Sequence, residues 1–294
     1  ASRFIMMNLE GAAITEPSAD ELQPADKWIL SKVNTLAKDV TENMDKYEMG
    51  IAVQKVYDFI WDEFCDWYIE ITKTRTYNKE QDPVSANAAF WTLKTVLTEA
   101  LKLLHPFMPY ITEEIWQVLT NEESMIMLES YPVYTKEHAY AEAAQFEKVI
   151  DAIRAIRNCR TSMNVPPSKK ASVYIETQDT ELFAAAAVFF EKLASASSVE
   201  VGTSFDLQDA ATAVTDSARI FIPMAELVDR EKELARLQKE QQKAQKDIDF
   251  LQKKLNNPGF LAKAPEQLVA AERAKLAKAT EKMEKILQSI AGLQ

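Results

Sequence analysis

Glycine is scarce in this sequence, with only 5 glycines among 294 residues. Glycine-rich phosphate loops and β-rich folds with many tight turns need more, so the sequence favours helices joined by short connections. Cysteine is nearly absent, because Cys65 and Cys159 are the only two and lie in no metal-type spacing, which argues against a disulfide framework. There is no apolar run of about 18 residues and no basic-then-apolar leader. We therefore expect a mainly α, soluble, cytoplasmic chain without a membrane span.

Catalytic residue patterns are also lacking. The two histidines, His105 and His138, stand in no constellation with a serine or cysteine, which favours packing or capping roles. Residues 58–70 combine aromatic and acidic side chains, but a buried aromatic stripe with a solvated acidic face explains them better than a metal site. The residues alone predict no catalytic site, no metal and no cofactor.

An excess of positive charge, which nucleic-acid partners favour, is missing from the whole chain, whose formal net charge is -11. The charge is unevenly distributed, however. Residues 227–294 contain 14 Lys plus Arg and 10 Asp plus Glu, which gives +4 and leaves -15 for the other 226 residues. Any site for an RNA backbone is therefore expected near the C-terminus.

What the sequence has is helical periodicity, which divides it into three regions. Residues 1–135 predict a helical bundle, with helices at 26–48, 51–77 and 85–104, a fourth that begins at Pro109, and a short N-terminal helix. The core face expected for the second of these comprises Val53, Val56, Tyr57, Ile60, Phe64, Trp67, Tyr68 and Ile71. Residues 136–225 predict a helix at 139–163 and a small α/β module with strands at 171–177, 199–202 and 219–223 and a helix at 180–196.

The third region, residues 226–294, carries two heptad repeats separated by turn residues at 256–259. The repeats run through Leu227, Leu234, Gln241, Ile248 and Leu255 with Leu237, Ala244 and Leu251, and then through Val269, Leu276, Met283 and Ile290 with Ala279, Ile286 and Leu293. They predict a C-terminal antiparallel coiled-coil hairpin about 40 Å long. Such a hairpin has little core beyond its seam, so we expect it to serve as an extended arm that reaches a distant contact.

Two groups of basic residues are candidate RNA contacts. Arg154, Arg157 and Arg160 precede a basic turn at 164–170, and either an RNA contact or salt bridges to the acidic bundle would explain them equally well. In the hairpin, eight basic residues face four acids between Lys253 and Lys285. Coiled coils often carry such charges for solubility alone, so this spacing by itself does not predict phosphate binding.

Several motifs resemble class I aminoacyl-tRNA synthetases. Residues 1–11, 25–31 and 57–68 (ASRFIMMNLEG, ADKWILS, YDFIWDEFCDWY) resemble their anticodon-binding bundle, and residues 104–116 (LHPFMPYITEEIW) are shared with the isoleucine and leucine enzymes. Residues 164–169 (NVPPSK) and 257–265 (NPGFLAKAP) resemble the bacterial valyl-tRNA synthetases. The resemblance covers nearly the whole chain, although the ATP-binding His-Ile-Gly-His and Lys-Met-Ser-Lys-Ser signatures do not occur in it.

The resemblance implies that the bundle reads the anticodon and that the hairpin lies against the tRNA elbow. Arg3 and Phe4 match the anticodon-contacting pair of the family, and Lys275 matches a basic elbow position. Lys253 lies at a neighbouring position, and Phe250 replaces an arginine of the family, so the elbow contact is either stacking or displaced to Lys253 and Lys254.

We therefore expect the tRNA-binding portion of a longer enzyme, without activity of its own. It would orient valine tRNA for ATP-dependent aminoacylation by a separate catalytic domain, as a monomer that binds neither DNA nor a membrane. Two alternatives stay open: a scaffold whose hairpin recruits a protein, and the same segment of an isoleucine or leucine enzyme.

Overall fold

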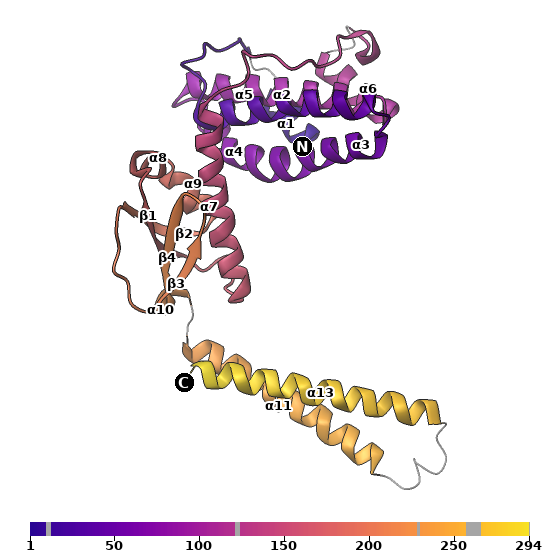
Figure 1. Cartoon of the computed structure of the whole chain (residues 1–294), viewed down its shortest axis with the longest axis vertical. Coiled ribbons are helices and arrows are strands. Elements are labelled where there is room, and N and C mark those ends of the chain that lie inside the picture. Colours follow the sequence, from indigo (N-terminus) through magenta and orange to yellow (C-terminus); the bar gives the residue numbers. More distant parts are fainter. Residues whose placement is uncertain (10–12, 121–123, 228–229, 257–265, 294) are drawn as a thin grey trace.

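The computed structural model describes residues 1–9, 13–120, 124–227, 230–256 and 266–293. In the last two helices it describes the side chains of residues 239, 241–256, 269, 271–283 and 287. The described chain is mostly helical and contains one four-stranded sheet (Figure 1). Within the described ranges, no helix is both long enough and apolar enough to cross a membrane.

The N-terminal region is a bundle of helices, as the periodicity predicts. Its helices are α1 (Ser2–Leu9), α2 (Pro24–Asp45), α3 (Met49–Asp58), α4 (Glu70–Tyr77), α5 (Pro83–Leu104) and α6 (Pro109–Thr120). Three of them begin with a proline, whose fixed φ suits the first helical position and whose missing N–H costs nothing there. The predicted helices at 26–48 and 85–104 and the start at Pro109 are confirmed.

The predicted helix at 51–77 differs from expectation in its middle. Between α3 and α4 the backbone forms a π-helix, η1 (Phe59–Ile69), whose bonds join residues five apart. The rings of Phe59 and Phe64, five residues apart, lie parallel with centroids 6.4 Å apart, so the wider turn places both in the core. Tyr57, predicted to be buried, is instead 58% exposed and lies parallel to Trp61. Helix α3 buries Ala52 and Val56, and the residue after Val56 points about 100° further round the helix, away from the core.

Residues 124–141, the described part of the passage from α6 to the next long helix, are irregular except for a short 3-10 helix, η2 (Ile126–Leu128), and side chains tie them to α2. The Asn34 amide donates to the Thr135 carbonyl at 2.7 Å and accepts from the Thr135 amide at 2.8 Å. His105 lies just after α5, with its Nδ1 2.7 Å from the hydroxyl of Thr112 in α6, which confirms the expected capping or packing role.

The α/β module follows helix α7 (Glu142–Ser162), which packs on α2 and on the sheet. The strands β1 (Ala171–Thr177), β2 (Ala196–Gly202), β3 (Ala210–Val214) and β4 (Ala218–Pro223) lie in the order β2-β1-β4-β3. Only the β1–β2 pair is parallel. The predicted helix at 180–196 is two short helices, α8 (Thr180–Ala185) and α9 (Ala187–Leu193), and β3 is a strand that the sequence did not predict.

The chain enters and leaves this module at neighbouring central strands. β1 follows α7, and β4 leads through α10 (Met224–Leu227) toward the C-terminal region. Because β1 and β4 are antiparallel, the start of one lies beside the end of the other. The Ser172 amide, at the start of β1, donates to the Glu226 carboxylate in α10 at 2.6 Å.

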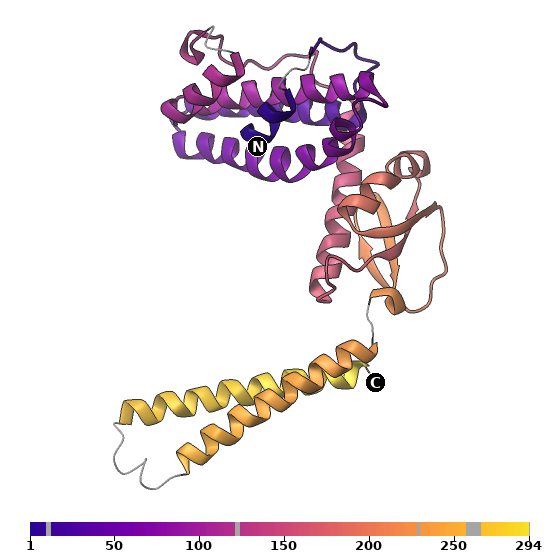
Figure 2. The same ribbon diagram turned by 180° about the vertical axis from the view of Figure 1, so that it is seen from behind.

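The C-terminal region is a pair of long helices, α11 (Arg230–Leu255) and α13 (Glu266–Leu293), which lie side by side and run in opposite directions (Figures 1 and 2). Its small core is separate from the main core and contains Ala244, Ile248 and Met283, with Leu276 and Ala279 packed against them. These residues lie at predicted heptad positions, and the coiled-coil hairpin itself stays a prediction. Residues 257–259 of the turn predicted at 256–259, and the matching motif at 257–265, lie outside the described residues.

Candidate nucleic-acid interface

The pair of C-terminal helices, called the arm below, carries a basic and aromatic patch near the end of α11. Phe250 is 67% exposed, Lys253 is exposed and Lys254 is half-buried. Lys275 of α13 is exposed on the neighbouring helix. The structure thus brings together Lys254 and Lys275, two residues named from the sequence, across the arm through a shared acidic partner.

That partner is Glu272 of α13, a carboxylate that is only 4% exposed. One oxygen lies 3.0 Å from the Lys275 amine and the other 3.3 Å from the Lys254 amine. The hydrogen bonds from Lys275 and then from Lys254 lower the pKa of Glu272 below its ordinary value. Since a lysine ammonium has three N–H donors, the exposed Lys275 amine can donate to a further acceptor such as a phosphate oxygen.

The second candidate region lies on α1. Arg3 is exposed, whereas Phe4 is half-buried and packs against the main core. The Lys73 amine of α4 lies 5.9 Å from the centroid of the Phe4 ring and also pairs with Glu70. An aromatic ring with a cation beside it can stack on an unpaired base, and the cation can attract the neighbouring phosphate.

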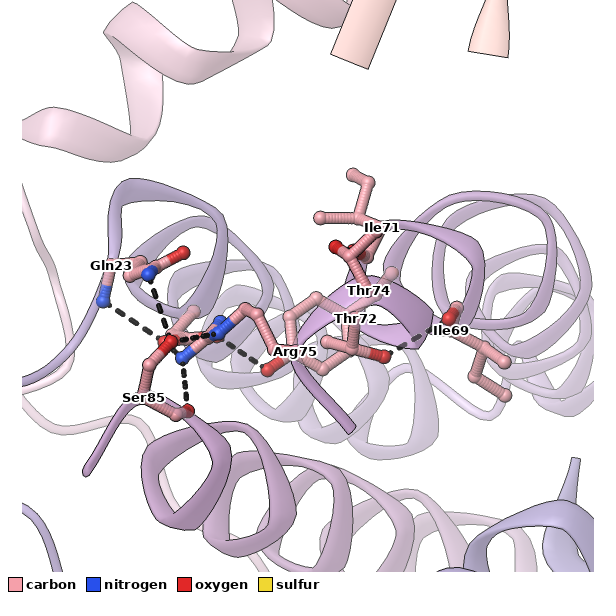
Figure 3. A network of polar contacts seen from close by, with 9 residues as sticks. Gln23, Ile69, Ile71, Thr72, Thr74, Arg75 and Ser85 are labelled. Atoms are coloured by element: carbon pink, nitrogen blue, oxygen red, sulfur yellow. Dashed lines mark hydrogen bonds and ion pairs between the residues drawn. The ribbon is translucent and has the colours of Figure 1, made fainter. Parts of the chain in front are cut away.

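The position of α4 is fixed by a buried polar network (Figure 3). The guanidinium of Arg75 donates to both oxygens of Asp26, at 2.7 and 2.8 Å, and Asp26 is fully buried in α2. Arg75 also donates to the hydroxyl and the carbonyl of Ser85 in α5, each at 2.8 Å, and Gln23 donates to the same hydroxyl. Three helices are therefore joined at one point, two residues from Lys73.

Tyr68 completes this network by donating to Asp26 at 2.6 Å. Burial, followed by the charge of Asp26, raises the pKa of Tyr68 well above its ordinary value, so the phenol keeps its proton. Burial by itself would lower the pKa of Arg75, but the hydrogen bond and charge of Asp26 outweigh it and the pKa is raised. The network thus combines the ion pair of Arg75 and Asp26 with a phenol that stays neutral.

The three arginines of α7 do not form one basic surface. Arg160 is buried, and its guanidinium donates to the carbonyl groups of Pro166 and Lys169. These contacts favour a structural role for Arg160, which holds the turn that follows α7, over the predicted RNA contact. Arg154 is exposed and pairs with Asp151 of its own helix, so an RNA contact there stays a prediction.

Arg157 connects the bundle to the α/β module. Its guanidinium carbon lies 4.7 Å from the ring centroid of Trp67 in η1, and its Nε donates to the Leu193 carbonyl at 2.6 Å. Burial lowers the pKa of Arg157, and the charges of Asp66 and Glu70 oppose that shift. Arg157 therefore has a structural role at this junction, and RNA contact there also stays a prediction.

Comparison with known protein families matches one family model to the bundle and α/β module and another to the arm. A family model described as the anticodon-binding domain of tRNA ligase matches residues 26–175, which is about half of the chain. The chain belongs to this anticodon-binding family. A second model, described as the valyl tRNA synthetase tRNA binding arm, matches residues 229–294 and so covers α11 and α13.

Valine–tRNA ligases are among the curated proteins to which the chain is similar. The protein of Clostridium acetobutylicum is 45% identical over 301 residues, and that of Bacillus subtilis is 39% identical over 281 residues. These alignments cover 100% and 94% of this chain but 34% and 32% of the relatives. The chain thus spans about a third of the length of the curated relatives that it matches.

Sequence reasoning missed Glu272 in the tRNA-binding arm and Lys73 in the anticodon-binding domain. Glu272 could have been found, because it lies seven residues before Ala279 and so occupies a seam position of the second heptad repeat. A carboxylate at such a position needs a partner. No comparable signal marks Lys73, whose approach to Phe4 depends on how α1 and α4 pack.

Proposed function

We propose that this chain is the tRNA-binding portion of a valine–tRNA ligase. It recognises the anticodon of valine tRNA with the bundle and the tRNA elbow with the arm, so that the acceptor end reaches a catalytic domain that uses ATP. The observation that supports this most is the union, in one chain, of an anticodon-binding domain and a valyl-tRNA synthetase arm. The chain itself holds no cofactor in this proposal and acts in the cytoplasm as a monomer.

The proposed mechanism is positioning. The arm acts as a stiff antiparallel coiled coil, on which Lys253, Lys254 and Lys275 neutralise backbone phosphates and Phe250 stacks. Arg3 and Phe4 read unpaired anticodon bases by hydrogen bonding and stacking. The bundle and the arm extend to the same side of the α/β module in Figures 1 and 2, which supports two separate contacts with one RNA.

The experiment is fluorescence anisotropy of the chain with a valine tRNA transcript and with the same transcript carrying another anticodon, at several salt concentrations. We expect tighter binding of the valine anticodon. Because each neutralised phosphate contributes about -0.7 to -0.9 to the slope of log K against log salt, Lys253→Ala with Lys275→Ala should flatten the slope by roughly 1.4 to 1.8.

The matched control is Lys239→Ala with Lys243→Ala, which removes the same charge from exposed positions nearer the start of α11. It should change the slope less. Equal binding of an unrelated hairpin RNA would contradict the proposal, and an unchanged slope in the Lys253 and Lys275 double variant would contradict the elbow contact. Preference for an isoleucine or leucine anticodon would reassign the specificity.

A further inference from the structure

Glu272 is an unusual residue for the seam of a helix pair. Most seam positions of the arm are apolar, as at Ile248, Leu276 and Met283, and the other polar one, Gln241, carries no charge. A buried carboxylate with two ammonium partners stabilises a protein no more, and often less, than a well-packed apolar side chain at the same place. Stability therefore does not explain why a glutamate occupies this position.

The contacts of Glu272 suggest what it does instead. It receives Lys275 from its own helix and Lys254 from the facing helix, one on each carboxylate oxygen. The charge-assisted bonds restrict two flexible side chains that would otherwise lose entropy on meeting a phosphate. The Lys254 pair also joins the two helices, which fixes their register near the patch.

We propose that Glu272 is a positioning residue of the arm, which holds the amines of Lys254 and Lys275 side by side so that they can bind neighbouring phosphates of an RNA backbone. This inference rests on the proposed function. It implies that a negative charge placed between two RNA-binding lysines strengthens RNA binding, although its charge alone would repel RNA.

The opposite effects of position and charge make a sharp test. Glu272→Gln keeps the shape of the side chain and removes one negative charge from the arm. If Glu272 only neutralises the lysines, the variant binds valine tRNA more tightly and with a steeper salt slope. If Glu272 positions them, binding weakens by roughly 3- to 10-fold, as expected when well-placed charge-assisted contacts lose their geometry, and the slope does not steepen.

Asp247→Asn is the matched control, because Asp247 is an exposed acid of α11 and the change removes the same charge. It should leave tRNA binding unchanged or tighten it slightly. Glu272→Gln is also introduced into the Lys254→Ala, Lys275→Ala variant. If Glu272 acts through the lysines, it causes no further loss of affinity there, whereas a further loss would show that it only holds the arm folded and would overturn the inference.

A measurement without RNA separates this inference from the proposed function. The acetylation rate of Lys275, followed by mass spectrometry, should rise in Glu272→Gln relative to that of Lys278, an exposed lysine of the same helix. An unchanged ratio overturns the positioning role. If the wild-type chain binds no tRNA, the proposed function fails, and the RNA role inferred for Glu272 fails with it. A raised acetylation ratio would then show only that Glu272 holds Lys275. If the wild type binds tRNA and Glu272→Gln binds it more tightly, the inference alone fails.

Discussion

Arg75→Ala should destabilise the bundle strongly. Asp26 is fully buried, and Arg75 supplies the positive charge that faces it through two hydrogen bonds of 2.7 and 2.8 Å. After the substitution the carboxylate keeps only neutral donors, the Tyr68 hydroxyl and the Gln23 amide. Removing one partner of a buried ion pair costs about 3–5 kcal/mol, because the remaining charge is left uncompensated.

Tryptophan fluorescence during urea unfolding measures this loss selectively. All five tryptophans lie in the bundle, at Trp28, Trp61, Trp67, Trp91 and Trp116. Unfolding of the arm therefore contributes little to the signal. With a urea slope of about 1–3 kcal/mol per M, a loss of 3–5 kcal/mol lowers the unfolding midpoint by about 1 M or more.

Two controls decide whether the buried charge is the cause. Lys38→Ala removes a cation from an exposed pair with Glu42, whose side chains are 55% and 52% exposed, and should cost at most about 1 kcal/mol. Asp26→Asn combined with Arg75→Met removes both charges and should recover much of the stability lost in Arg75→Ala. A loss below about 1 kcal/mol in Arg75→Ala, or no recovery in the double variant, would refute the reasoning.

Two further predictions concern the junction and the arm. Arg157→Ala removes the contact with Trp67 and the hydrogen bond to Leu193, which should cost about 1–3 kcal/mol in the same fluorescence assay, and a loss within 0.5 kcal/mol of zero would contradict a structural role there. The pKa of Glu272 is lowered in the folded arm, so its stabilisation is present above the ordinary value of 4.5 and is lost as pH falls through the lower folded value. Circular dichroism melts of the chain should therefore show the arm weakening below about pH 4.5 in the wild type but less in Glu272→Gln, and an identical acid response would refute this assignment.

The sequence predicted most of the helical architecture, because hydrophobic spacing and proline positions act locally. The starts of α5 and α6 at Pro83 and Pro109 are within two residues of expectation. The predictions failed where tertiary packing determines the backbone conformation. The π-helix at Phe59–Ile69 has the amphipathic pattern of an α-helix, and the strand Ala210–Val214 is short and rich in alanine, which has little strand preference.

The candidate site was predictable only in part for the same reason. Composition places the positive charge in the arm, but it cannot say which cations stay available. Arg160 and Arg154 have the same charge and lie on one helix, yet the first is buried against backbone carbonyl groups and the second is exposed. Only the fold distinguishes the two arginines, because Arg160 is buried by a turn that lies beyond the end of their helix.

The neighbouring ends of the α/β module have a consequence for how such chains can vary in length. Because β1 begins beside the place where β4 ends, the segment from Ala171 to Pro223 leaves and rejoins the connection between α7 and the arm at neighbouring points. Insertions or deletions inside this segment leave its two ends next to each other. The module can therefore grow, shrink or be exchanged while the distance between the bundle and the arm is preserved.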